Sequence, residues 1–193
     1  MKIELISEKD NKLSFSVSGA STPFANLVRR FGMGQLPVFA IDSVTFYENS
    51  SALFDEYIAH RLGQLPLTSD TDKSADEVIL TLEAEGPSTV YSKALKSTDS
   101  KIKSSLDNIP LLKLLEGQNI RLEAKARRGI GQKHAKFQPG LISYEILGDG
   151  EFKFKVESFM QLEPRDVLAK TADLIVEHCE ALEKNLAEVK KSE

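Results

Sequence analysis

The sequence predicts an α+β protein. Two short strand patterns and a helix pattern open the chain, the middle mixes strands with short helices, and a strand hairpin with a long helix closes it. The 193 residues are enough for one ordinary domain or two small ones. The content of 41% hydrophobic and 28% charged residues is ordinary for a globular chain.

The first strands are expected at residues 3–7 and 13–17, around a polar turn at 8–11. Apolar residues alternate with serines along 13–17, which is typical of a half-buried strand. Thr22 and Pro23 then open a helix, because proline suits the first helical turn. We expect Gly32 or Gly34 to end it. Its apolar face comprises Phe24, Leu27, Val28 and Phe31.

Residues 39–47 are expected to be extended, and a short helix follows at 51–62. Ser50 or Ser51 could cap its start, and Gly63 suits a left-handed stop. The acidic residues Asp55 and Glu56 lie in the early turns, where the helix dipole favours negative charge. The expected apolar face comprises Leu53, Phe54, Tyr57, Ile58 and Leu62.

The middle of the chain is more varied. A polar loop is expected at 68–77, and a helical turn or two at 109–115. No structure is predicted for 97–108. A basic, glycine-containing loop is expected at 127–136. The predicted strands of this region are 78–85, 90–95 and 120–126.

A hairpin is expected at 141–147 and 152–156, around a Gly-Asp-Gly turn. The last helix runs from Glu163 to about Val189, and the tail 190–193 should fray. A helix of this length spans roughly 40 Å, more than a small domain can cover, so part of it should need a partner. Its apolar residues follow an unbroken heptad spacing: Leu168, Ala172, Ile175, Cys179, Leu182, Leu186 and Val189.

Composition narrows the function. The net charge of −4 argues against strong direct DNA binding. A single cysteine, Cys179, allows no internal disulfide framework and favours a reducing compartment. The amino terminus lacks an apolar stretch of signal-peptide length, and no segment has the roughly 20 apolar residues of a membrane-spanning helix. We therefore expect a cytoplasmic protein.

Catalytic groups are hard to find. The histidines are His60, His134 and His178, and none stands at metal-ligand spacing from another histidine or from Cys179. Gly129-Ile-Gly131 fits neither a P-loop nor a dinucleotide fingerprint. His134 lies between Lys133 and Lys136, yet no nucleophile or carboxylate partner is visible. The sequence predicts no catalytic residue, metal or cofactor.

The segment Asn49-Ser-Ser-Ala-Leu-Phe-Asp-Glu-Tyr-Ile-Ala-His-Arg-Leu-Gly-Gln-Leu-Pro-Leu67 closely resembles one in the D subunit of archaeal DNA-directed RNA polymerase. That family is related to the bacterial alpha subunit and to the third-largest subunit of eukaryotic polymerase II. Further matching segments follow in family order at 24–30, 37–44, 115–129, 134–139 and 152–158. One departure is that Phe159 and Met160 stand where the family pattern would have a small residue or glycine.

The resemblance implies an alpha-like dimerisation domain, an antiparallel sheet plus two helices, formed by residues 1–39 and 141–193. An inserted mixed α/β domain at 40–140 would interrupt it, without the iron–sulfur cluster that some members carry, since several thiolates are needed to hold one. The implied function is a non-catalytic assembly scaffold within the polymerase. The implied partners are the small L subunit, small zinc-binding subunits and the second-largest subunit.

By the same resemblance, the interface with the L subunit would comprise Phe24, Leu27, Val28, Arg29, Arg30, Phe31, Leu168, Ala172, Ile175, Cys179, Leu182, Leu186 and Val189. Docking to the large subunit would involve Asn49, Arg61, His134 and Lys136. Two alternatives stay open. The chain could form an alpha-like homodimer through the same helices, or act as a stand-alone enzyme that uses His134.

Overall fold

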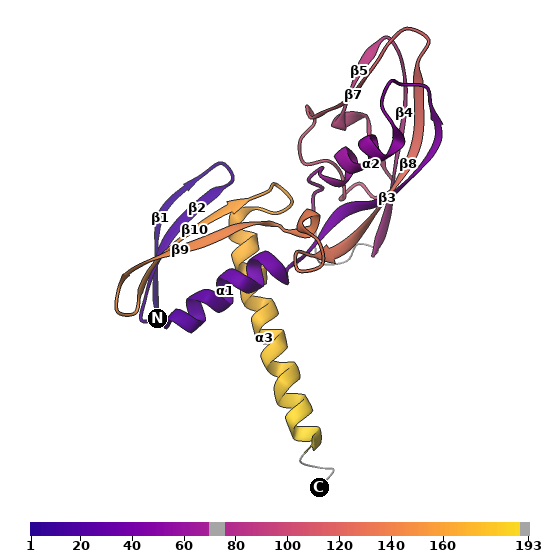
Figure 1. Cartoon of the computed structure of the whole chain (residues 1–193). Helices are drawn as coiled ribbons and strands as arrows, with labels where there is room; N and C mark the ends of the chain where they lie inside the picture. Colours follow the sequence, from indigo (N-terminus) through magenta and orange to yellow (C-terminus); the bar gives the residue numbers. More distant parts are fainter. Residues whose placement is uncertain (70–75, 190–193) are drawn as a thin grey trace. The chain divides into compact units, whose positions relative to one another are not determined.

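The computed structural model describes residues 1–69 and 76–189 and divides the chain into two compact units (Figure 1). The terminal unit comprises Met1–Leu36, Pro139–Ser158 and Glu163–Glu193, and the central unit comprises Pro37–Gln138 and Phe159–Leu162. Most of the loop expected at 68–77 and the tail 190–193 lie outside the described residues. The assignment of residues 1–39 and 141–193 to dimerisation, and of 40–140 to an insert, stays a prediction.

The terminal unit contains a four-stranded antiparallel sheet with the order β1-β2-β10-β9. The four predicted strands are confirmed, each longer than expected. Tight turns join the first pair and the last pair of these strands, with positive φ at Asp10 and at Gly150. The strands are β1 (Lys2–Lys9), β2 (Lys12–Ser18), β9 (Gly140–Gly148) and β10 (Glu151–Ser158).

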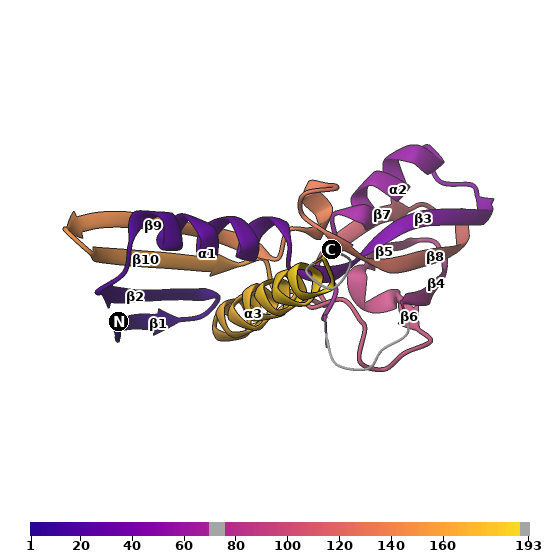
Figure 2. The same ribbon diagram turned by 90° about the horizontal axis from the view of Figure 1, so that it is seen from below.

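Both helices of this unit, α1 (Thr22–Gly34) and α3 (Pro164–Val189), lie over one face of the sheet (Figure 2). Alternation places the apolar side chains of β2 and β10 on that face, and the rings of Phe15 and Phe154 stack there at 5.1 Å between centroids. The buried residues of these two strands are Leu13, Phe15, Val17, Phe152, Phe154 and Val156.

Small residues let α1 approach the sheet and α3 closely. Its buried residues are Ala25 and Gly32. A Cβ atom on Gly32 would lie 2.4 Å from Cδ1 of Ile142 and 2.9 Å from Oγ1 of Thr171 on α3. A side chain at Gly32 would therefore force α1 away from both the sheet and α3.

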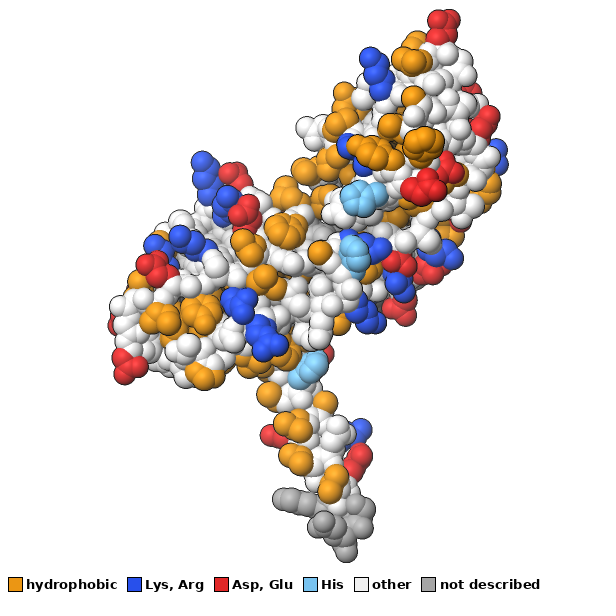
Figure 3. All heavy atoms as spheres, in the orientation of Figure 1, with side chains coloured by type: hydrophobic (Ala, Val, Ile, Leu, Met, Phe, Trp, Pro, Cys, Tyr) orange, Lys and Arg blue, Asp and Glu red, His pale blue; other side chains and the backbone are white. Residues whose placement is uncertain are grey.

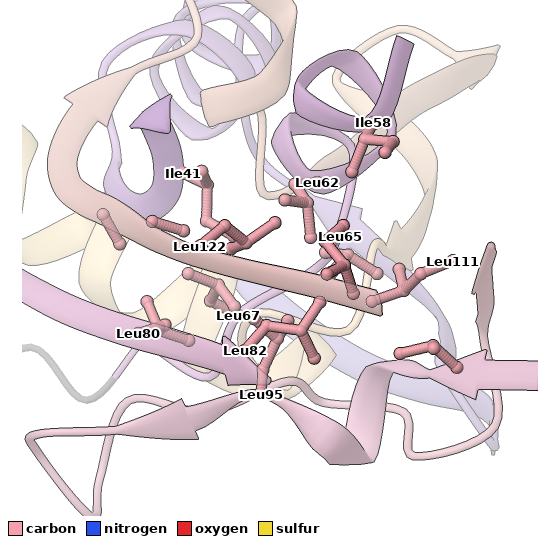
Figure 4. Packing of buried hydrophobic residues seen from close by; sticks show 14 of the residues in the cluster. Ile41, Ile58, Leu62, Leu65, Leu67, Leu80, Leu82, Leu95, Leu111 and Leu122 are labelled. Atoms are coloured by element: carbon pink, nitrogen blue, oxygen red, sulfur yellow. The ribbon is translucent and has the colours of Figure 1, made fainter. Parts of the chain in front are cut away.

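The central unit has a second antiparallel sheet, with the order β3-β8-β4-β6, and a two-stranded sheet of β5 and β7. Its strands are β3 (Pro37–Asn49), β4 (Glu77–Glu85), β5 (Ser88–Tyr91), β6 (Lys96–Ser97), β7 (Pro110–Leu114) and β8 (Asn119–Ile130). Helix α2 (Asp55–Gly63) packs against these strands through Ile58 and Leu62. Both residues are buried together with many leucines in one core (Figure 4). Short 3₁₀ turns occur at η1 (Ser92–Ala94) and η2 (Ala135–Phe137).

Several predictions for this unit were wrong, in whole or in part. Residues 109–115 do not form a helix, because Pro110–Leu114 pair with Ser88–Tyr91 as a strand. The strand expected at 90–95 stops at Tyr91 and turns into η1. The basic loop expected from Arg127 begins only after Ile130, since β8 continues to pair with β3 over that stretch.

The helix expected at 51–62 begins four residues later, at Asp55, and neither Ser50 nor Ser51 caps it. Instead, the Ser51 hydroxyl accepts from the Leu53 N–H and donates to Oδ1 of Asn49, which builds a turn before the helix. The expected left-handed stop at Gly63 is also wrong: Gly63 is the last helical residue, and Gln64 follows with φ −89°.

The departure at Phe159–Met160 has a visible consequence. Met160 adopts a left-handed backbone with φ of 74°, a conformation that favours glycine. The chain therefore keeps the turn that a glycine would suit, although a larger side chain stands there.

Candidate interaction surfaces

The heptad stripe of α3 is covered near the start of the helix and exposed beyond it. Pro164, Val167 and Thr171 are buried against the terminal unit, and Leu168 and Ile175 are half-buried. From Val176 onward every described residue of the helix is exposed, including Cys179 and Leu182, the latter 60% exposed. Hydrophobic side chains therefore line the projecting length of α3 (Figure 3).

The predicted apolar face of α1 is also incompletely covered. Phe24 and Leu27 are exposed, while Val28 and Phe31 are half-buried. The ring of Phe31 meets the ring of His178 edge-on, at 5.3 Å between centroids. This contact places the end of the α1 stripe beside the exposed part of α3.

The two arginines of α1 differ in their contacts. Arg29 donates to Oδ1 of Asn26 through Nε and Nη2, at 3.2 and 2.8 Å. Arg30 is exposed. The pairing with Asn26 holds the Arg29 guanidinium against its own helix, so only Arg30 extends outward.

The edge strand β1 adds residues that sequence analysis did not select. Ile3 and Leu5 pair with Val17 and Phe15 and so belong to the helix-bearing face, yet they are 60% and 56% exposed. Their alternation with charged residues was the available signal. A groove of about 350 Å³ runs beside them. It is lined by Met1, Ile3, Leu5, Leu13, Phe15, Val17, Phe24, Val28, Phe154, Arg165, Leu168 and Ala172.

One ion pair crosses the rim of this groove. Nε of Arg165 donates to Oε1 of Glu8 at 2.7 Å, and Nη2 donates to Oε2. The hydrogen bond from Arg165 lowers the pKa of the Glu8 carboxyl. This bidentate contact ties the β1–β2 hairpin to the start of α3. The apolar residues that line the groove lie between the hairpin and the helix.

In the central unit, Asn49 organises the turn before α2. Its Nδ2 donates to the Leu53 carbonyl at 2.9 Å and to Oδ1 of Asp55 at 2.7 Å. Its Oδ1 accepts from the N–H and the hydroxyl of Ser51. The amide of Asn49 is therefore occupied within its own unit and shapes the surface indirectly.

Helix α2 buries only part of the apolar face that the sequence predicts for it. Of its expected apolar face, Ile58 and Leu62 are buried, but Phe54 is 81% and Tyr57 is 53% exposed. Phe54 stands before the helix, as its N-cap residue, and is not part of the buried face. A groove of about 410 Å³ lies beside Tyr57, and it is lined by Tyr57, His60, Arg61, Gln64, Leu65, Ile109 and Leu111.

The loop after β8 is held by charge. Nζ of Lys136 lies 2.6 Å from Oδ1 of Asp42 and over the ring of Phe137, and only 13% of the Lys136 side chain is exposed. Arg127 pairs with the other oxygen of Asp42 at 2.8 Å. The hydrogen bond from Lys136 holds the pKa of the Asp42 carboxyl below its ordinary value, and Arg127 adds to this.

His134 is exposed at the tip of that loop, and its Nδ1 accepts from the Lys136 N–H at 3.1 Å. No group of three or more histidine, cysteine or acidic side chains in the described part of the chain could hold a metal ion. No described helix is long and apolar enough to cross a membrane. Exposed apolar residues occur in both units, on β1, α1 and α3 in the terminal unit and at Phe54 and Tyr57 in the central unit.

Comparison with known proteins assigns the class. Residues 40–143 match the model of the RNA polymerase Rpb3/RpoA insert domain, so the central unit is of the kind found in alpha-like polymerase subunits. The chain is similar to DNA-directed RNA polymerase subunit Rpo3 of several archaea.

The chain is 41% identical to Rpo3 of Pyrococcus furiosus, over 93% of this chain and 71% of that protein. It is 46% identical to Rpo3 of Thermococcus kodakarensis, over 76% of this chain and 60% of that protein. It is 40% identical to Rpo3 of Methanocaldococcus jannaschii, over 84% of each chain. The chain thus spans 60% to 84% of the length of these relatives. It belongs to the family of Rpo3, the alpha-like D subunit of archaeal RNA polymerase, which confirms the resemblance drawn from the 49–67 segment.

Proposed function

We propose that this chain is a non-catalytic assembly scaffold of an archaeal DNA-directed RNA polymerase and pairs with the small alpha-like L subunit. The observation that carries the proposal is the exposed apolar surface of the terminal unit. It combines the far half of α3, the stripe of α1 and the uncovered end of the sheet at Ile3 and Leu5.

The physical argument is the free energy of burial. Burying one leucine or isoleucine side chain contributes about 1.5–3 kcal/mol, and several such side chains lie on this face. A partner built from the same kind of helices could place its apolar stripe against α3 and fill the groove beside β1. Heptad spacing suits that packing because it keeps one seam facing the partner helix.

The proposed interface residues have different roles. Leu182, Leu186 and Val189 would be buried by the partner alone, since all three are exposed here. Leu168, Ala172, Ile175 and Cys179 would continue the seam toward the sheet, and Phe24, Leu27, Val28 and Phe31 would form its second wall. Arg30 would contact the rim, with Arg29 braced by Asn26.

The central unit would dock onto the second-largest subunit, with small zinc-binding subunits joining the heterodimer. Arg61 and His134 would make contacts directly. Asn49 and Lys136 would act indirectly, because their polar groups already bond within the central unit. Asn49 would fix the turn before α2, and Lys136 would fix the loop after β8. We do not expect direct DNA contact, and we expect these encounters to take place in the cytoplasm.

The two alternatives predict different behaviour. A homodimer would use the same face, so the chain alone would sediment as a dimer. A stand-alone enzyme would need a reactive group beside His134, yet its Nδ1 is occupied by the Lys136 N–H and neither groove described above is lined by it. We therefore favour the scaffold.

The test is co-purification with the L subunit. Ile175→Asp or Leu182→Asp should abolish recovery of the heterodimer, because a carboxylate in an apolar seam loses its hydration without a counter-charge. The matched control is Lys184→Asp, which puts the same side chain on the opposite, exposed face of α3. Near-normal recovery of both seam variants would refute this interface.

A further inference from the structure

One face of α2 forms a wall of the groove in the central unit. Tyr57, His60, Arg61 and Gln64 follow one another at intervals of three, one and three residues, which aligns them on one side of a helix. Leu65 and Leu111 are buried beneath, and Ile109 forms the facing edge. The groove therefore has an apolar floor and a polar rim.

The rim is positive at the end of α2. Arg61 is the charged side chain among the lining residues, the ring of His60 and the Tyr57 hydroxyl add polar groups, and no carboxylate lines the groove. The acidic residues of the helix, Asp55 and Glu56, lie in its first turn and do not line the groove. An anionic group would meet favourable charge here.

Arg61 supplies a second, independent observation. Its Nη2 donates to the Pro110 carbonyl, but its Nε is buried and has no hydrogen-bond partner among the described residues. A buried donor without an acceptor costs free energy. A carboxylate is the group that a guanidinium binds with two parallel hydrogen bonds, and Nε is a donor of Arg61 that lacks an acceptor among the described residues.

The exposed aromatic rings indicate the other half of the ligand. Tyr57 lines the groove with a large, exposed ring, and Phe54, three residues earlier in the chain, is exposed as well. Figure 3 shows hydrophobic side chains gathered over α2 with a histidine beside them. Aromatic residues and arginine are the side chains that most often dominate binding energy at protein interfaces.

We infer that this groove binds a short segment of the second-largest polymerase subunit in which a large apolar side chain stands beside an aspartate or glutamate. The apolar side chain enters between Tyr57 and Leu111, and the carboxylate meets Arg61 and His60. This inference rests on the docking role proposed above and adds the chemistry of the segment that docks.

The experiment uses the full chain and labelled overlapping short peptides that cover the second-largest subunit of the cognate polymerase. Fluorescence anisotropy measures Kd for each peptide. We expect binding by a peptide with an apolar residue next to an acidic one. Tyr57→Ser and Arg61→Gln should each raise the Kd of that peptide about tenfold or more. Arg61→Lys should recover only part of the affinity lost in Arg61→Gln, because lysine keeps the charge but cannot form the two parallel hydrogen bonds of a guanidinium.

The matched control is Tyr47→Ser, since Tyr47 is exposed on β3 to a similar degree, 57% against 53% for Tyr57, and does not line this groove. It should leave Kd unchanged. If Arg61→Gln unfolds the chain, Tyr57→Ser carries the test, because its ring is already exposed.

The inference is overturned if no such peptide binds, if binding peptides lack an acidic residue, or if Tyr57→Ser binds like Tyr47→Ser. The peptide titration does not require the L subunit. Failure of the heterodimer therefore refutes the scaffold proposal and leaves the groove result standing. A chain that pairs with the L subunit but binds no peptide refutes only the groove.

Discussion

The two units bury their hydrophobic residues to very different extents. In the central unit, leucines from both sheets and from α2 close into one core, and Leu62 and Leu122 are almost fully buried (Figure 4). In the terminal unit, leucines of the same kind on α3 and β1 remain exposed. The central unit thus closes its core with its own side chains, whereas the terminal unit leaves apolar residues of α3 and β1 uncovered by its own side chains.

The comparison teaches that periodicity identifies an apolar face without telling what covers it. The stripe of α2 and the stripe of α3 both have helical spacing. Ile58 and Leu62 pack inside the unit, but Leu182 and Leu186 do not. Length accounts for part of the difference, since α2 has 9 residues and α3 has 26, of which every described residue from Val176 onward is exposed.

The largest effect on stability should come from the closed core. Leu62→Ala should lower the free energy of unfolding by about 2–5 kcal/mol, because it removes buried methyl groups and leaves a cavity. Urea unfolding of the isolated chain measures this. A loss below about 1 kcal/mol would mean that the core around Leu62 collapses to fill the space.

A smaller effect is expected where α1 crosses α3. Gly32→Ala should cost about 1–3 kcal/mol, since its Cβ would meet Ile142 and Thr171 at under 3 Å. Gly34→Ala on the same helix is the control, because nothing lies within 4 Å of that Cβ. Equal stability of the two variants would show that the packing of α1 against the sheet and α3 accommodates a methyl group at Gly32.

The ion pairs of Asp42 should give a pH-dependent effect. Its pKa is lowered in the folded chain, so its contribution is fully present above the ordinary carboxyl pKa of about 4 and is lost as pH falls through the lowered value. Asp42→Asn should reduce the loss of unfolding free energy between neutral and acidic pH, measured by urea unfolding at a series of pH values. Asp173→Asn, at an exposed position on α3, should leave that loss unchanged. An unchanged loss in Asp42→Asn would contradict a structural role for Asp42.

The smallest effect should occur on α3. Leu182→Ala should change the stability of the isolated chain by less than about 0.5 kcal/mol, because the side chain is already exposed. The same substitution should weaken the complex with the L subunit. Strong destabilisation of the isolated chain would show that this face is covered by the chain itself.

Much of the fold was predictable, because strands such as β2 and β10 alternate cleanly and α3 keeps its spacing throughout. The strand β7 was not, because Ile-Pro-Leu-Leu-Lys-Leu-Leu fits a helical pattern equally well, and only pairing with β5 decides it. That pairing is non-local and has no signature in the segment itself.

The candidate surfaces were predictable in part for a similar reason. The stripes of α1 and α3 can be read from spacing, but the exposure of Phe54 depends on where α2 begins, because Phe54 precedes the helix. The side chains of Asn49 and Ser51 set that start by hydrogen bonds that compete with helix formation. Ile3 and Leu5 look like ordinary strand residues until the sheet is seen to extend past its helices.

Hydrogen exchange of the chain with and without the L subunit tests the central claim most directly. We expect added protection of backbone amides along 176–189 and in β1, with little change in the buried core around Leu62 and Leu122 of the central unit. Protection confined to the central unit, with exchange along 176–189 unchanged, would contradict the account.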